Sequence, residues 1–219
     1  MTRYRWFNAS WPQNMRALSN RLKSKMFVDD SREGFVIDKV RDDFVEARFI
    51  ERIEFTDVVV DPFGSELTCE RVSFNHCEFR VSSDRPGLEL LNAPRNTQKL
   101  VANLIQMNDF EVSIESLSID VLDWFHRFQN NVDVDVNVDS IQIGSFEISE
   151  GISVKAAVKG NRDVRDAVSK LTHGRPYEIE KIQLRLTGQY IGKVLLTNVG
   201  SAVIEVDHNE SLLNSLRAS

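Results

Sequence analysis

Acidic side chains recur at alternate positions in the segment Val132-Asp-Val-Asp-Val-Asn-Val-Asp139, and hard cations such as Mg²⁺ and Ca²⁺ bind carboxylate oxygens. In a strand, Asp133, Asp135 and Asp139 would share one face, with next neighbours ~7 Å apart. A metal-dependent hydrolase could use this row if other carboxylates converged on it. Such a row is also typical of the solvated face of a half-buried sheet. We favour that second interpretation and expect no cofactor.

The rest of the chain lacks the signature of a catalytic or nucleotide-binding site. An EF-hand starting at Asp133 fails, because Val138 stands where glycine is required and Gly144 stands where the bidentate acid is required. The sequence contains no G-x-S-x-G, H-E-x-x-H, C-x-x-C or G-x-G-x-x-G motif. These absences favour a noncatalytic protein without excluding an enzyme.

Positive charge is concentrated at the start of the chain. Residues 1–28 contain six basic and no acidic side chains, whereas the remaining residues contain 21 basic and 33 acidic ones. Cations interleaved with aromatic rings are typical of surfaces that bind nucleic acid, phospholipid or acidic protein. The same charges could instead dock on the acidic body of this chain. The candidate binding surface consists of Arg3, Arg5, Trp6, Trp11, Arg16, Arg21, Lys23 and Lys25.

Composition indicates an ordinary folded protein. The chain has 219 residues, of which 42% are hydrophobic and 27% are charged. No apolar run has the length of a membrane span or a signal peptide, so we expect a cytoplasmic protein. Cys69 and Cys77 would lie ~26 Å apart in one extended strand, too far for a disulfide. Free thiols fit the same reducing compartment.

A long hairpin is the clearest structural prediction. Alternating apolar residues run through 44–60 and 66–81, on either side of Asp61-Pro62-Phe63-Gly64. Proline at the second turn position and glycine at the fourth favour a type I turn. We therefore expect two long antiparallel arms joined at this turn.

Helical patterns are shorter. Ser10 and Gln13 have the spacing of a capping box with Pro12 in the first turn, which predicts a helix that continues to residue 26. One narrow arc of that helix is apolar and its flanks are cationic. Other helices are expected over residues 96–107, 121–129 and 161–174, and a polar helix over 210–217.

These elements predict an α+β fold in which antiparallel sheet, as a long hairpin or meander, predominates and three to four short helices pack on it. The loop-like stretch 83–92 suggests two parts: residues 1–84, with the basic helix and hairpin meander, and residues 85–219, an α+β half with alternating helices and strands. One continuous domain is the alternative.

The leading functional hypothesis is a noncatalytic interaction or structural module, as a subunit of a larger assembly, that uses its basic aromatic start and its sheet edges. Its expected partner is another protein. The first alternative is a nucleic-acid-binding protein that uses the N-terminal cations, with Trp6 or Trp11 stacking on bases. The second is the metal-dependent hydrolase already described. The sequence does not predict the oligomeric state.

Overall fold

The computed structural model describes residues 1–132, 134–206 and 210–217. These residues form eleven strands and five helices, which confirms an α+β fold dominated by antiparallel sheet. The predicted helix count of three to four was wrong. The last helix, α5 (Glu210–Arg217), is not a polar appendage, because Leu212, Leu213 and Leu216 are all buried. In the described part of the chain, no helix combines the length and apolar character that a membrane crossing requires.

The chain divides into two compact units. We call residues 8–114 the hairpin unit, and residues 1–7 together with 115–219 the terminal unit. β1 (Thr2–Ala9) and β6 (Ile114–Ser116) run across the boundaries between them. The sequence predicts two domains that meet near residue 85, and this stays a prediction. The two compact units have different boundaries, at residues 7/8 and 114/115.

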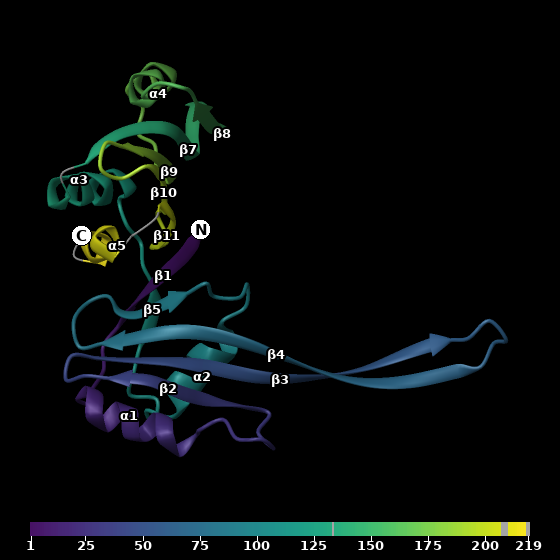
Figure 1. Cartoon of the computed structure of the whole chain (residues 1–219). Coiled ribbons are helices and arrows are strands. Elements are labelled where there is room, and N and C mark those ends of the chain that lie inside the picture. Colours follow the sequence, from purple (N-terminus) through teal and green to yellow (C-terminus); the bar gives the residue numbers. More distant parts are fainter. Residues whose placement is uncertain (133, 207–209, 218–219) are drawn as a thin grey trace. The chain divides into compact units, whose positions relative to one another are not determined.

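The hairpin unit contains a four-stranded antiparallel meander and two helices, α1 and α2 (Figure 1). Helix α1 buries Met15, Leu18 and Leu22. It begins later than the capping box predicted, because the side chain of Asn14 caps it by accepting a hydrogen bond of 2.8 Å from the Ala17 N–H. The elements are α1 (Met15–Ser24), β2 (Glu33–Val40), β3 (Phe44–Val60), β4 (Glu66–Ser82), β5 (Gly87–Leu91) and α2 (Gln98–Gln106).

The long hairpin is confirmed. β3 and β4 pair without a register shift from Phe44 opposite Ser82 to Val60 opposite Glu66. The carboxylate of Asp61 closes the turn by accepting hydrogen bonds of 2.8 Å from the N–H groups of Phe63 and Ser65. Local turn chemistry therefore suffices to join the two strands.

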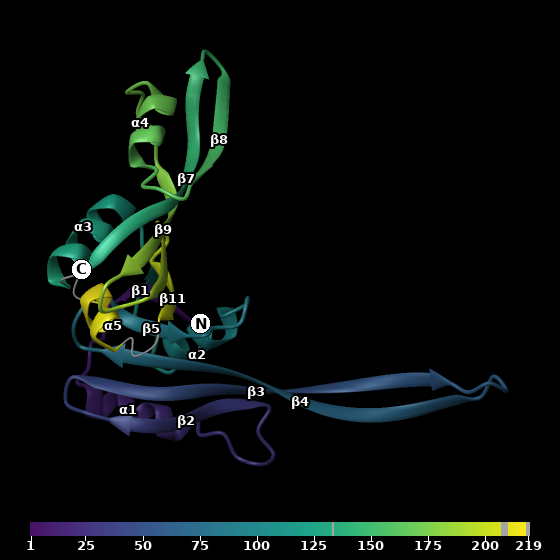
Figure 2. The ribbon, with the colours of Figure 1, turned by 45° about the horizontal axis from the view of Figure 1, so that its top comes forward.

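The outer half of this hairpin has no neighbouring strand among the described residues. β2 pairs with β3 only as far as Glu51, and β5 pairs with β4 only from Glu78 onward. Beyond these positions the two strands continue as a ribbon that leaves the sheet (Figures 1 and 2). We call residues 53–73 the arm.

The terminal unit is a six-stranded antiparallel sheet in the order β1-β11-β10-β9-β7-β8, with β6 beside β1. Its core includes the rings of Trp6 and Trp124, which meet edge to face with centroids 5.7 Å apart. β7 and β8 form a hairpin that ends the sheet, with α4 beside it (Figure 2). The remaining elements are α3 (Val121–Asn131), β7 (Asp135–Ser149), β8 (Ile152–Lys159), α4 (Arg165–Thr172), β9 (Ile179–Thr187), β10 (Gly192–Thr197) and β11 (Ser201–Val206).

Candidate interaction site

Three of the six N-terminal cations meet acidic side chains of their own unit. All three lie on α1 or directly after it, and their partners come from the β2–β3 turn, the loop after α2 and the start of β2. The sequence left open whether these charges would face the chain's own acidic body, and for these three the structure shows that they do. The pairs are Arg16 with Asp42 at 2.9 Å, Arg21 with Asp109 at 2.6 Å, and Lys25 with Glu33 at 2.9 Å.

The other predicted binding residues are divided between the two units. Arg3, Arg5 and Trp6 lie on β1 in the terminal unit, and the guanidinium of Arg5 lies 4.7 Å from the Phe7 ring centroid. Trp6 is only 2% exposed, so its ring is not available for stacking on a base. Trp11, in the hairpin unit, donates a hydrogen bond of 2.9 Å from Nε1 to the carbonyl of Gly87.

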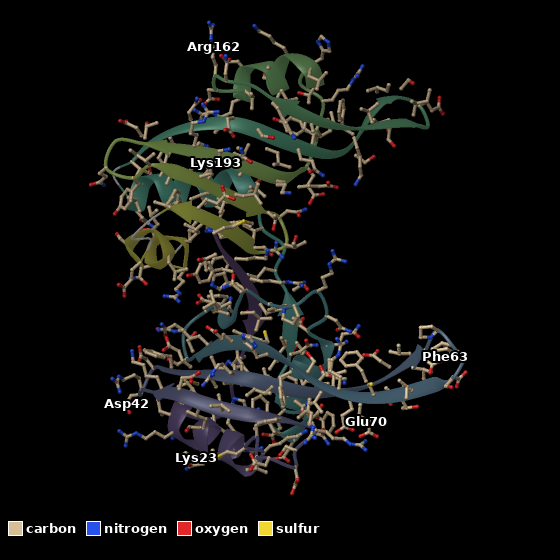
Figure 3. The ribbon with its side chains drawn as sticks, turned by 45° about the vertical axis from the view of Figure 1, so that its right-hand side comes forward. Lys23, Asp42, Phe63, Glu70, Arg162 and Lys193 are labelled. Carbon is tan, nitrogen blue, oxygen red and sulfur yellow. The ribbon has the colours of Figure 1, made fainter. Side chains whose placement is uncertain are left out.

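Lys23 points away from the apolar side of α1 and is exposed (Figure 3). Within the described ranges, no acidic group lies at ion-pair distance from it. With Arg16, Arg21 and Lys25 paired, the basic start of the chain offers less free charge than its composition predicts.

The carboxylate row does not form one solvated face. Asp133 lies outside the described residues. Asp135 is exposed, whereas Asp139 is only 5% exposed. Asp139 lies where the register of β7 against β9 shifts, and the side chains of Gln183 and Arg185 on β9 cover its carboxylate.

Asp139 is already fully partnered. It accepts hydrogen bonds of 2.8 Å from Gln183 Nε2 and 2.8 Å from Arg185 Nη2. The described residues contain no group of three or more His, Cys, Asp or Glu side chains that could hold a metal ion. The contacts of Asp139 give that side chain a structural role.

A small hollow at the base of the arm has mixed polar and apolar walls, and its one cysteine is not an activated nucleophile. Its lining includes Glu51, His76, Cys77 and Lys99, and the Lys99 ammonium is paired with the Glu51 carboxylate. Burial, and secondarily the charge of Glu78, raises the pKa of the Cys77 thiol to about 12. A thiol with this pKa stays protonated at neutral pH, so it is not poised for nucleophilic attack.

The arm exposes apolar side chains along its whole length. Their exposed fractions range from 38% for Phe55 to 93% for Phe63, which lies at the tip (Figure 3). The run Val58-Val59-Val60 was visible in the sequence, but a strand buried on both faces would have the same composition. The exposed apolar side chains of the arm and its base are Phe55, Val58, Val59, Val60, Phe63, Leu67, Val72 and Phe74.

Both faces of the arm are apolar in part. The pairing register puts Phe55, Val59 and Leu67 on one face and Val58 and Val72 on the other. At the inner end, the ring of Phe74 makes an edge-to-face contact with Phe27, with centroids 6.1 Å apart. Neither face of the outer ribbon is covered by another described element.

The arm is also acidic. Residues 53–73 contain five acidic side chains and one basic side chain. The basic residue, Arg71, lies with its guanidinium carbon 5.1 Å from the Phe55 ring centroid and with Nε 3.9 Å from Asp57 Oδ2. The surface thus combines exposed apolar groups with a net negative charge.

Comparisons with other proteins add no identity: no protein-family model matches the chain, and no curated protein sequence is similar to it. The functional argument therefore depends on the geometry of this molecule. Among the described features, the arm is the strongest candidate for an interaction site, because it exposes a contiguous apolar surface.

Proposed function

We propose that the protein is a noncatalytic interaction subunit and that the arm is the element that docks on another protein. The observation that carries the proposal is the row of exposed apolar side chains on both faces of a two-stranded ribbon. A lone two-stranded ribbon is marginally stable in water, and contiguous apolar patches on soluble proteins mark interaction sites.

The chemistry of the arm defines what it would bind. Phe55, Phe63 and Phe74 are large rings that can anchor an interface when a partner encloses them. The net negative charge of the ribbon favours a partner whose contact surface is apolar and positively charged.

The N-terminal cations take a secondary part in this proposal. Because Arg16, Arg21 and Lys25 already pair with acidic groups of their own unit, binding to another acidic surface would have to compete with those ion pairs. Binding through the arm would leave these three ion pairs intact. Nucleic-acid binding by these cations stays a prediction from the sequence.

The test is to purify the tagged protein from its native cells and to compare it with a variant of the arm. Phe55→Ser, Phe63→Ser and Phe74→Ser together remove the aromatic anchors. Phe63 is 93% exposed, so Phe63→Ser should change the free energy of unfolding by no more than about 0.5 kcal/mol. Phe55→Ser and Phe74→Ser also lose the contacts with Arg71 and Phe27, which are worth about 0.5–1.5 kcal/mol each. The expected result is loss of the specific partner with an unchanged circular dichroism spectrum.

A matched control removes exposed apolar groups elsewhere. Phe110, Leu171 and Ile191 are 75%, 46% and 81% exposed and lie outside the arm. The triple serine variant at these positions should retain the partner that the arm variant loses. If both variants and the intact protein retain the same partners, the docking role of the arm is wrong.

A further inference from the structure

We infer that the partner of the arm is a second copy of this chain, in which the outer edge of β4 adds to the free edge of β8. The inference rests on the proposed function, because it names the occupant of the same docking element. Strand addition uses main-chain hydrogen bonds for affinity and side-chain pairs for register.

Both strands have an unpaired edge. Between Glu66 and Phe74, β4 pairs with β3 alone, and β8 pairs with β7 alone at the end of its sheet, as far as the described residues extend. Each edge presents a row of unpaired N–H and C=O groups. Such edges pair with other chains unless they are protected.

The charged side chains of the two edges match in spacing. Glu66 and Glu70 are four residues apart on one face of the arm, and both are exposed (Figure 3 labels Glu70). Lys155 and Lys159 are also four residues apart on the exposed face of β8. An antiparallel register with Glu66 opposite Lys159 therefore places Glu70 opposite Lys155, and opposite charges directly across a strand pair are stabilising.

The same register matches the apolar side chains on the other face. It sets Leu67 opposite Val158 and Cys69 opposite Ala156. Val158 and Ala156 are half-buried, and Leu67 is 56% exposed. One register thus satisfies both faces, whereas a shift by one residue would set the carboxylates of β4 against Val158 and Val154.

Charge also selects β8 over a second arm. Two arms would bring their net negative charges together, which opposes association. β8 itself, by contrast, carries two lysines and no acidic side chain. Lys159 and the neighbouring Arg162 (labelled in Figure 3) are exposed, and no described acidic group lies at ion-pair distance from either. Lys155 pairs with Glu180 at 2.7 Å, so its contact with Glu70 would compete with that ion pair, whereas the contact of Lys159 with Glu66 would not.

Each copy would offer one arm and one β8 edge. A reciprocal exchange between two copies closes a two-fold dimer with both edges covered, and a one-way exchange builds a chain of copies. Either arrangement uses the same contact, and both make the apparent mass depend on protein concentration.

The experiment measures self-association of the full chain by sedimentation equilibrium, with two charge-reversal variants. Glu66→Lys with Glu70→Lys sets lysine against lysine, and Lys155→Glu with Lys159→Glu sets glutamate against glutamate. We expect the intact protein to self-associate and each variant to do so at least about tenfold more weakly. Mixed in equal amounts, the two variants should re-form the complex, because each arm then meets a β8 of opposite charge.

Control variants reverse the same number of charges outside the contact. Glu111→Lys with Asp30→Lys, and Lys170→Glu with Arg95→Glu, change exposed residues and should associate as the intact protein does. This comparison separates the specific contact from an effect of net charge.

Three outcomes overturn the inference: an intact protein that stays monomeric up to about 100 µM, association that neither contact variant weakens, or a mixture of the contact variants that fails to re-form the complex. A different result would contradict the proposed function: the variant with serine at the three aromatic positions of the arm would retain every partner in cells. A monomeric intact protein with an arm-dependent foreign partner would overturn this inference alone.

Discussion

Lys25 Nζ lies 2.9 Å from Glu33 Oε1, and this ion pair joins the end of α1 to the start of β2. Asn103 of α2 is only 7% exposed and bridges the pair: its amide donates to Glu33 at 3.1 Å, and its oxygen accepts from Lys25. A cation that the sequence assigns to a binding surface thus helps to hold three elements together. Its contribution to folding can be measured through pH.

Glu33→Gln should weaken the dependence of stability on pH in acid. Hydrogen bonding from Lys25 above all holds the pKa of the Glu33 carboxyl below its ordinary value. The folded state therefore gains stability above the unfolded pKa of about 4.3 and loses it as pH falls through the folded pKa. Urea unfolding between pH 3 and pH 7 should show that the free energy of unfolding falls less steeply with decreasing pH in the variant. At neutral pH the variant should be less stable than the intact protein by under about 1 kcal/mol. Glu111→Gln is the control, and equal slopes for Glu33→Gln and the intact protein would contradict the role of the pair.

Asp139→Asn should destabilise the terminal unit. The substitution keeps the volume but replaces a buried carboxylate that accepts from Gln183 and Arg185 with a neutral amide. Loss of such charge-assisted bonds costs about 1–3 kcal/mol in the free energy of unfolding. Asp135→Asn, at an exposed position of the same strand, should cost less than about 0.5 kcal/mol. Similar costs for the two variants would show that Asp139 is not the structural anchor we describe.

The two thiols should react at very different rates. Cys69 is exposed on the arm, whereas Cys77 is buried and its pKa is raised to about 12. With a thiol-specific chromogenic reagent at pH 8, one thiol per chain should react quickly and the second only after unfolding, because the thiolate is the reactive form. Cys69→Ser should abolish the fast phase. A fast phase that survives this substitution would place Cys77 in contact with solvent.

Gly87→Ala should destabilise the hairpin unit by more than about 2 kcal/mol. Gly87 has a φ of 91°, and a Cβ at this position would lie 2.0 Å from the carbonyl oxygen of Ala9. Gly64 is the matched control: its φ is 86°, but a Cβ there meets no atom within 4 Å. Gly64→Ala should therefore cost only the backbone strain, about 1–2 kcal/mol. Equal melting temperatures for the two variants would rule out the steric contribution at Gly87.

Local patterns were enough to predict the hairpin closely. Alternation and the turn at Asp61 to Gly64 predict arms over residues 44–60 and 66–81, and the strands are Phe44–Val60 and Glu66–Ser82. The same local approach started α1 too early, because Ser10 and Asn14 are both good caps and spacing alone does not choose between them. It also placed Asp139 on a solvated face, because the Gln183 and Arg185 side chains that cover it come from another strand, more than 40 positions along the chain.

The sequence by itself determined where strands, turns and apolar runs lie, since these follow from neighbours within a few residues. Only the tertiary structure decided which of those runs are covered. β2 pairs with β3 only as far as Glu51, and β5 pairs with β4 only from Glu78 onward. No described strand therefore covers the edges of the arm, although its composition would also suit a buried strand. Likewise, Arg21 meets Asp109 from 88 positions away along the chain. Burial and ion pairing depend on contacts between distant segments, and these exist only once the chain has folded.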